Sequence, residues 1–178
     1  MENGGEDGKV NKMRFREKSE HCLDDKGRLS LPSRFRDQLR CYDSEILIVS
    51  IWGRDHLRVF PLGDWEEIEN KLEIDLEGLE ERLPLLDDDD PEFAKMSRQL
   101  EQIRNRLIDI KECPLDKQGR ILLSQQVREQ VGIHKDIVLI GRGKLFELWG
   151  KENWEQGRER LAAIAGKHDD TRAALGVL

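Results

Sequence analysis

The sequence predicts an α+β fold in which two tandem repeats pack on each other as an intrachain pseudo-dimer, with a helical hairpin inserted between them. The first observation is an internal repeat. Residues 23–31 (LDDKGRLSL) and 115–123 (LDKQGRILL) both read L-D-x-x-G-R before an apolar strand, at an offset of 92 residues. The match continues to Trp65 and Trp154, three positions out of step. The second observation is that the segment between the copies has a helical period. Two copies are too few for a solenoid, which favours two halves of one unit.

Each repeat is expected to contain a strand, a turn, a strand, a short helix and a β-hairpin. We assign residues 13–63 to the first repeat, 64–110 to the inserted helical hairpin and 111–165 to the second repeat with a closing helix. The polar residues 1–12 are expected to form a disordered leader and residues 166–178 a flexible tail, because neither has a hydrophobic period.

The short helix of each repeat is predicted from an apolar residue at every fourth position, which places one buried stripe along it. Pro32 suits the first helical position in the first copy, and Ser124 can cap the helix in the second. The stripes are Leu31, Phe35 and Leu39, and Leu123, Val127 and Val131.

The inserted hairpin is predicted from two amphipathic runs separated by Pro84 and four consecutive aspartates. Asp64 and Asn153 each precede Glu or Gln by three residues, so we expect them to cap the helix that ends each repeat. Asp90-Pro91 predicts the start of the second hairpin helix. The apolar positions are Trp65, Ile68, Leu72, Leu76, Leu79 and Leu83, then Phe93, Met96, Leu100, Ile103 and Leu107.

The charge of the chain is unevenly distributed. The net charge is −7, and residues 64–92 hold fourteen acidic and two basic residues. That segment alone carries −12, so the remainder is about +5 and can bind phosphates locally. The three cysteines are scattered and form no CxxC pair, which indicates reduced thiols in a cytoplasmic protein. No window is apolar enough to span a membrane.

Catalytic and metal sites are not favoured. Asp24 and Asp25 are adjacent, and only Asp24 recurs in the second copy. The aspartates at 87–90 lack the spacing of a calcium loop, and His21, Cys22 and Cys113 lack zinc spacing. No phosphate loop or nucleotide fingerprint occurs. We therefore expect no enzyme activity, no metal, no cofactor and no small-molecule substrate.

The repeated turns carry the candidate site. Gly27 and Gly119 are expected to take positive φ, and Asp24 and Asp116 to bond the turn amides, so these four residues shape the turns. Strand alternation places Arg28 and Arg120 off the core face. One interpretation is that each arginine only forms a local salt bridge with the aspartate of its own turn and has no further role. Nearby cations favour a phosphate or guanine contact instead: Lys26, Arg34, Arg36 and Arg40 in copy one, Lys117 and Arg128 in copy two.

The first signature, Leu23-Asp24-x-Lys26-Gly27-Arg28-Leu29-Ser30-Leu31-Pro32 with Phe35-Arg36, resembles the bacterial MraZ family. The second, Leu115-Asp116-x-x-Gly119-Arg120 with Lys144-Leu145-Phe146-Glu147-Leu148-Trp149, resembles it too, and Met13-Arg14-Phe15-Arg16 is similar to the family's beginning. The resemblance implies AbrB-like swapped-hairpin barrels and a transcriptional regulator of the division and cell-wall gene cluster, including its own promoter. It also implies rings that bind repeated promoter boxes of double-stranded DNA and associate with the nucleoid.

The resemblance implies that Arg28 and Arg120 contact DNA, and we add Lys26, Lys117, Arg14 and Arg16 as candidates. Copy two has Ser124 in place of Pro32 and Gln125-Gln126 where a basic residue is expected. We therefore expect Arg28→Ala to weaken DNA binding more than Arg120→Ala. The alternative is an antitoxin-like protein-interaction module, although such barrels usually have one repeat and a disordered tail.

Overall fold

The fold is described from a computed structural model, which describes residues 14–42, 44–53 and 55–160. The predicted leader 1–12, the predicted tail 166–178 and residues 161–165 of the predicted second repeat lie outside this range. Both repeats contain the same elements in the same order. The first contains β1 (Lys18–Cys22), β2 (Arg28–Ser30), α1 (Ser33–Leu39), β3 (Ile46–Trp52) and β4 (His56–Pro61). The second contains β5 (Ile110–Pro114), β6 (Arg120–Leu122), α4 (Gln125–Gln130), β7 (Asp136–Gly141) and β8 (Phe146–Gly150), followed by helical residues 151–160.

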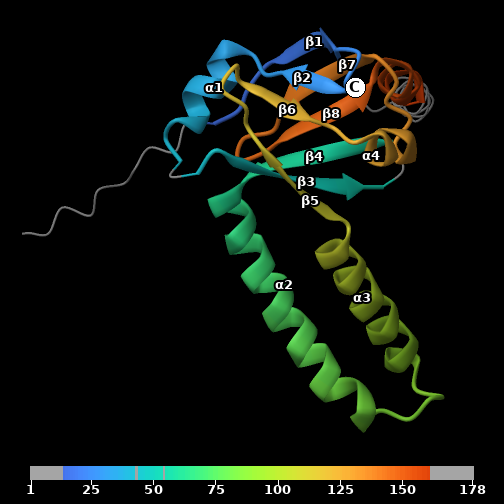
Figure 1. Ribbon diagram of the computed structural model, residues 1–178. Helices are drawn as coiled ribbons and strands as arrows, with labels where there is room; N and C mark the ends of the chain where they lie inside the picture. The colour runs from blue at the N-terminus through green and yellow to red at the C-terminus, as the bar shows by residue number, and fades with distance from the viewer. Residues whose placement is uncertain (1–13, 43, 54, 161–178) are drawn as a thin grey trace, which may run out of the picture.

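The two repeats exchange strands to build one barrel (Figure 1). A six-stranded sheet has the order β1-β7-β8-β4-β3-β5, and β2 pairs with β6 in a two-stranded sheet. The pairings β1–β7, β3–β5, β4–β8 and β2–β6 all join one repeat to the other. The α+β fold with an intrachain pseudo-dimer is therefore confirmed.

Two strand pairs place equivalent residues of the two repeats face to face. In the β2–β6 ladder, Leu29 is opposite Ile121, its equivalent at an offset of 92. In the β4–β8 ladder, Arg58 is opposite Glu147, its equivalent at the offset of 89 that relates Trp65 to Trp154. A pseudo-twofold axis therefore passes through both pairs.

The barrel core is built from both copies. All six residues of the two predicted stripes are at most 5% exposed. Phe15, Phe35 and Phe146 meet with ring centroids 5.1 to 5.3 Å apart, which brings the start of copy one, its helix and the last strand of copy two together. Edge-to-face and tilted contacts of this kind add about 1 kcal/mol per pair beyond burial.

Two predicted helix starts are wrong. α2 (Leu62–Arg82) begins directly after β4, and Asp64 lies inside its first turn, where it is buried and accepts a hydrogen bond from Tyr42 Oη at 2.6 Å. Asn153 lies inside the closing helix and donates to the Val131 carbonyl at 2.9 Å. Both side chains tie a helix to the barrel instead of capping it. Pro32 is the residue before α1, one position earlier than predicted. Ser124 and Asp90 cap α4 and α3 (Pro91–Ile108) as predicted.

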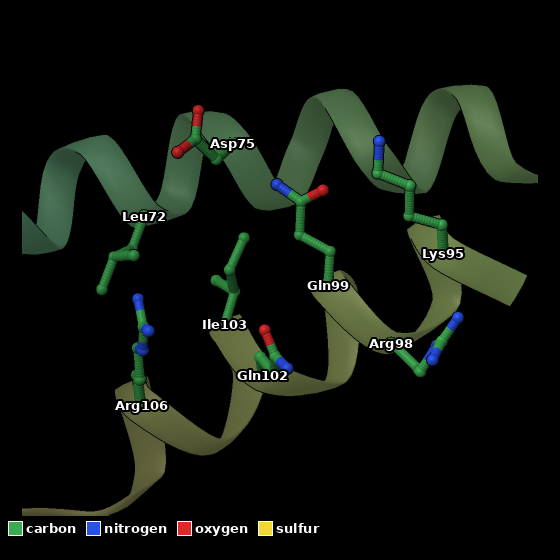
Figure 2. A pocket seen from close by; sticks show the side chains of 8 residues that line it. All are labelled: Leu72, Asp75, Lys95, Arg98, Gln99, Gln102, Ile103 and Arg106. Carbon is green, nitrogen blue, oxygen red and sulfur yellow. The ribbon is translucent and has the colours of Figure 1, made fainter. Parts of the chain in front are cut away.

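The inserted segment is an arm that projects from the barrel, in which α2 and α3 lie side by side and a short 3-10 helix (Leu83–Leu85) follows α2 (Figure 1). The arm has its own apolar cluster of Leu79, Met96, Leu100 and Ile103 with partly buried leucines around it. A groove of about 550 Å³ lies between the helices and is lined by Leu72 and Asp75 of α2 and by cationic side chains of α3, and Figure 2 shows Leu72 opposite Arg106. None of the helices in the described part of the chain is long and apolar enough to cross a membrane.

Candidate nucleic-acid interface

The two D-x-x-G-R turns lie at opposite ends of one small ladder. β2 and β6 are antiparallel, with Arg28 opposite Leu122 and Ser30 opposite Arg120. Turn 24–27 therefore precedes one end of the ladder and turn 116–119 precedes the other. Because the ladder crosses the pseudo-twofold axis, it presents the two turns as a related pair.

The first turn is held by Asp24. Its Oδ1 accepts hydrogen bonds from the backbone amides of Lys26 at 3.0 Å and Arg28 at 2.9 Å, and its Oδ2 accepts from Arg28 Nε at 2.6 Å. The backbone bond from Arg28 is the main reason that the pKa of Asp24 lies below its ordinary value, and the Arg28 side chain adds to it. Gly27 has φ of 79°, a conformation that glycine takes without strain.

The second turn repeats this geometry. Asp116 Oδ1 accepts from the amides of Gln118 and Arg120, both at 2.9 Å, and Oδ2 accepts from Arg120 Nε at 2.8 Å. Partial burial alone would raise the pKa of Asp116, but the bonds from the Arg120 amide and side chain outweigh it, and the pKa is lowered. Gly119 has φ of 74°. In both turns the arginine thus has a salt bridge to its own aspartate.

Each turn is also clamped by the other repeat. The Leu31 amide donates to the Gly119 carbonyl and the Leu123 amide to the Gly27 carbonyl, both at 3.0 Å. The Arg36 side chain lies over Gly119, and Arg128 lies over Gly27. A methyl group on Gly119 would come within 2.1 Å of Arg36 Cδ, and one on Gly27 within 2.9 Å of the Leu123 carbonyl oxygen.

Sequence reasoning missed this role of Arg36 and Arg128. The linear sequence indicates only that each adds positive charge near the turn of its own copy. Arg128 Nε donates to the Leu123 carbonyl at 3.1 Å, so this guanidinium holds the residue whose amide bonds to Gly27 of the other repeat. The available signal was the equivalence of the two arginines at an offset of 92, which implied a shared structural position.

The other candidate DNA-binding residues are two lysines on the turns and two arginines before β1. Lys26 and Lys117 are exposed on the turns, and the side chains of Arg28 and Arg120 are 31% and 25% exposed. Arg14 and Arg16 are exposed before β1, on the segment whose backbone pairs with Gly141 and Gly143 of the last hairpin.

The expected distribution of basic residues around the turns is wrong. Arg36 and Arg40 belong to copy one, but they line a hollow beside the 116–119 turn of copy two. Arg34 forms an exposed ion pair with Glu17. The barrel exchanges strands between repeats, so the helix of copy one serves the turn of copy two. Arg28 therefore does not have the richer basic surroundings that the linear sequence indicated.

The structure also places the residues that were candidates for metal binding or catalysis. Among residues 14–42, 44–53 and 55–160, no group of three His, Cys, Asp or Glu side chains is placed to hold a metal ion. Cys22 and Cys41 are exposed and Cys113 is buried, and all three are free thiols. Asp25 is exposed beside the turn and takes no part in the hydrogen bonds that hold it.

The comparisons with known proteins match both repeats. A family model described as "MraZ protein, putative antitoxin-like" matches residues 14–87 and 107–176. The chain is 34% identical over 159 residues to the transcriptional regulator MraZ of Methylococcus capsulatus, covering 87% of this chain and 93% of the relative. It is 39% identical over 145 residues to that of Halorhodospira halophila, covering 81% and 84%, and 34% identical over 158 residues to that of Coxiella burnetii, covering 88% and 93%. The chain belongs to the MraZ family.

Proposed function

We propose that this protein is a transcriptional regulator that binds specific double-stranded DNA sequences through the two D-x-x-G-R turns. The relatives named above are transcriptional regulators, and they align with most of this chain. The observation that carries the proposal is the paired presentation of Arg28 and Arg120 at the two ends of the β2–β6 ladder. A related pair of rigid arginine-bearing turns suits two contacts on one duplex.

The salt bridge within each turn is compatible with this role. Asp24 holds Arg28 through Nε, and a guanidinium has two further nitrogens that can donate to a base edge or a phosphate. A held arginine also loses less side-chain entropy on binding than a mobile one. The aspartate therefore orients the arginine, and Gly27 and Gly119 let the turns close tightly. Lys26 and Lys117 supply positive charge at the turns, and Arg14 and Arg16 supply it before β1.

The targets we propose are repeated promoter boxes of the division and cell-wall gene cluster, including the protein's own promoter, at which it acts as a repressor. We further propose that copies assemble into a ring, so that weak contacts by single copies add up over several boxes. Such a protein works in the cytoplasm, associated with the nucleoid. It uses no cofactor and has no enzyme activity.

The test is binding of the full chain to a duplex from its own upstream region, measured by fluorescence anisotropy against a shuffled duplex of equal length. We expect the upstream duplex to bind at least tenfold more tightly at the same salt concentration. Equal binding to both duplexes would reject sequence-specific recognition. The family description also includes the term antitoxin-like, so a second candidate is a module that binds another protein. In that case neither duplex binds at moderate salt, and a stoichiometric protein complex forms in the cell.

A further inference from the structure

The hollow beside the 116–119 turn is built by both repeats. Its volume is about 330 Å³. Copy one contributes Arg36 and Arg40 from the end of α1, with Tyr42 and Ser44 after it, and copy two contributes the turn with Lys117. Neither repeat alone contains this set of side chains, so the hollow exists only because the two halves are packed together.

Three cationic side chains reach the hollow. Arg40 forms an ion pair with Asp37 at 3.1 Å, and both side chains are largely exposed, so water screens this pair strongly. Lys117 is exposed on the turn. Arg36 Nε is shielded from solvent and has no hydrogen-bond partner within the described chain. A shielded donor without an acceptor is costly, and an anion in the hollow is a natural acceptor for this group of side chains.

The acidic groups of the hollow oppose an anion less than their number suggests. Asp116 already accepts three hydrogen bonds from its own turn and forms a salt bridge with Arg120. Its charge is thus compensated locally. Glu45 is exposed, so water screens its charge as it screens the charges of Arg40 and Lys117. The remaining charge of the hollow is positive.

The corresponding positions around the first turn are different. The equivalents of Arg40 and Lys117 are Gly132 and Asp25, whereas Gln118, whose equivalent is Lys26, goes the other way. Arg36 is matched by Arg128, whose Nε is already bonded to the Leu123 carbonyl. Around the second turn these four positions hold three positive charges, whereas around the first they hold two positive charges and one negative charge. The pseudo-twofold symmetry is therefore broken in favour of the second turn.

We propose that the hollow beside the 116–119 turn binds a phosphodiester group of the DNA backbone, held by Arg36, Arg40 and Lys117. The second turn is then the tighter of the two DNA contacts, although the linear sequence indicated the first. This inference rests on the proposed function, because it assumes that the turns face DNA. It adds a contact that reads no sequence and sets the position of Arg120 on the duplex.

The test uses Arg40→Gln and Lys117→Gln in the full chain, with Arg98→Gln on the arm as a matched control for loss of one exposed positive charge. Binding to the upstream duplex and to the shuffled duplex is measured between 50 and 250 mM KCl. Because both side chains hold the same phosphodiester group, each hollow variant should lower the slope of log Kd against log salt concentration, by at most about 0.9, the value for one phosphate contact. The weakening should be equal on the two duplexes. Arg98→Gln should keep the parental slope.

Two results would overturn the inference and leave the proposed function intact. One is parental slopes for both hollow variants while the parent binds its upstream duplex specifically. The other is a loss confined to the upstream duplex, which would assign these side chains to base recognition. If the parent binds neither duplex, the proposed function fails and the phosphate site fails with it. Melting temperatures of all variants check that a changed slope does not come from unfolding.

Discussion

Arg58 and Glu147 lie directly opposite each other on β4 and β8, with Nε and Oε1 3.7 Å apart, and they occupy equivalent positions in the two repeats. In a symmetric homodimer this position would face its own copy, so a charged residue would meet the same charge. The tandem chain places opposite charges there. Glu147 is 6% exposed and also accepts hydrogen bonds from Trp149 Nε1 at 3.1 Å and Arg142 Nε at 3.2 Å. The pseudo-twofold axis therefore passes through a polar network that only an asymmetric pair can form.

Removing this carboxylate should destabilise the barrel. Glu147→Ala leaves Arg58 beside an empty position and Trp149 Nε1 without its acceptor. Breaking a buried charge network costs about 3 kcal/mol, and the partial exposure of the two arginines reduces the expected loss in free energy of unfolding to about 2 kcal/mol. Urea unfolding followed by tryptophan fluorescence measures it. Glu112→Ala, at an exposed position of β5, is the control and should change the stability by less than about 0.5 kcal/mol.

The two turn glycines should differ in their tolerance of alanine. Both have positive φ, so each substitution costs about 1 kcal/mol in backbone strain. Gly27→Ala also drives the new methyl group against the Leu123 carbonyl, which belongs to the backbone and cannot move aside. The three atoms nearest to a methyl group on Gly119 all belong to the flexible Arg36 side chain. We expect Gly27→Ala to lower the melting temperature more. Adding Arg36→Ala should rescue part of the loss in Gly119→Ala, and no rescue would contradict the clamp.

The two turn arginines should contribute unequally to DNA binding. Loss of an arginine that reads a base costs roughly 1–3 kcal/mol of binding free energy per site. Because the second turn has the richer cationic surroundings, we expect Arg120→Ala to weaken binding to the upstream duplex more than Arg28→Ala. Anisotropy titrations of both variants at one salt concentration give the comparison. If Arg28→Ala is the more damaging, the asymmetry argued from the hollow is wrong. If both variants bind the duplex as tightly as the parent, the two arginines only form salt bridges with Asp24 and Asp116 and do not contact DNA.

The turns should lose stability in acid. The pKa values of Asp24 and Asp116 in the folded protein lie below the ordinary value of 3.8. Their ionised forms therefore stabilise the folded state relative to the unfolded state. Their contribution is complete above the unfolded pKa and disappears as pH falls through the lower folded pKa. The gap in melting temperature between the parent and the double variant Asp24→Asn, Asp116→Asn should therefore be full at pH 6 and shrink below about pH 4. A gap that is independent of pH would show that the carboxylate charges do not hold the turns.

The three thiols should react in a fixed order. Burial raises the pKa of Cys113 to about 11, and the hydrogen bond that Cys22 donates to Asp136 is the main cause of its raised pKa. Thiolate is the reactive form, so iodoacetamide at pH 8 should label exposed Cys41 first, then Cys22, and Cys113 last. Peptide mass spectrometry over time gives the order. Unfolding the protein in guanidinium chloride should make the three labelling rates similar. Rapid labelling of Cys113 in the folded protein would contradict its burial.

Much of the fold could be predicted because both copies obey the same local rules. The glycine of each turn, the aspartate four residues before the arginine and the stripe at every fourth position are all readable from neighbouring residues. Two identical patterns also predict that the halves pack on each other. The wrong helix starts have a tertiary cause. Asp64 bonds to Tyr42 and Asn153 to Val131, and these partners are 22 residues away in the chain.

The site was less predictable because strand exchange separates sequence neighbours. Arg36 and Arg40 follow the first turn by about ten residues, yet they lie beside the second turn. Linear charge clustering therefore assigned them to the wrong arginine. The distinction between the turns depends on which helix lies over which glycine, and this is set by the pairing of β2 with β6. Local sequence contains no information on that pairing.

The separate core of the arm makes its length independent of the barrel. The chain leaves the sheet at the end of β4 and returns at β5, and only β3 lies between these two strands, so the gap is about 10 Å across the sheet. In the described part of the chain the strands pair with one another, and neither α2 nor α3 belongs to a sheet. The 21 residues of α2 extend about 30 Å. Adding two turns to α2 and two turns to α3 would lengthen the arm by about 10 Å. Insertion or deletion of helical turns should therefore change how far the arm extends from the barrel. We expect the register of every strand to stay the same.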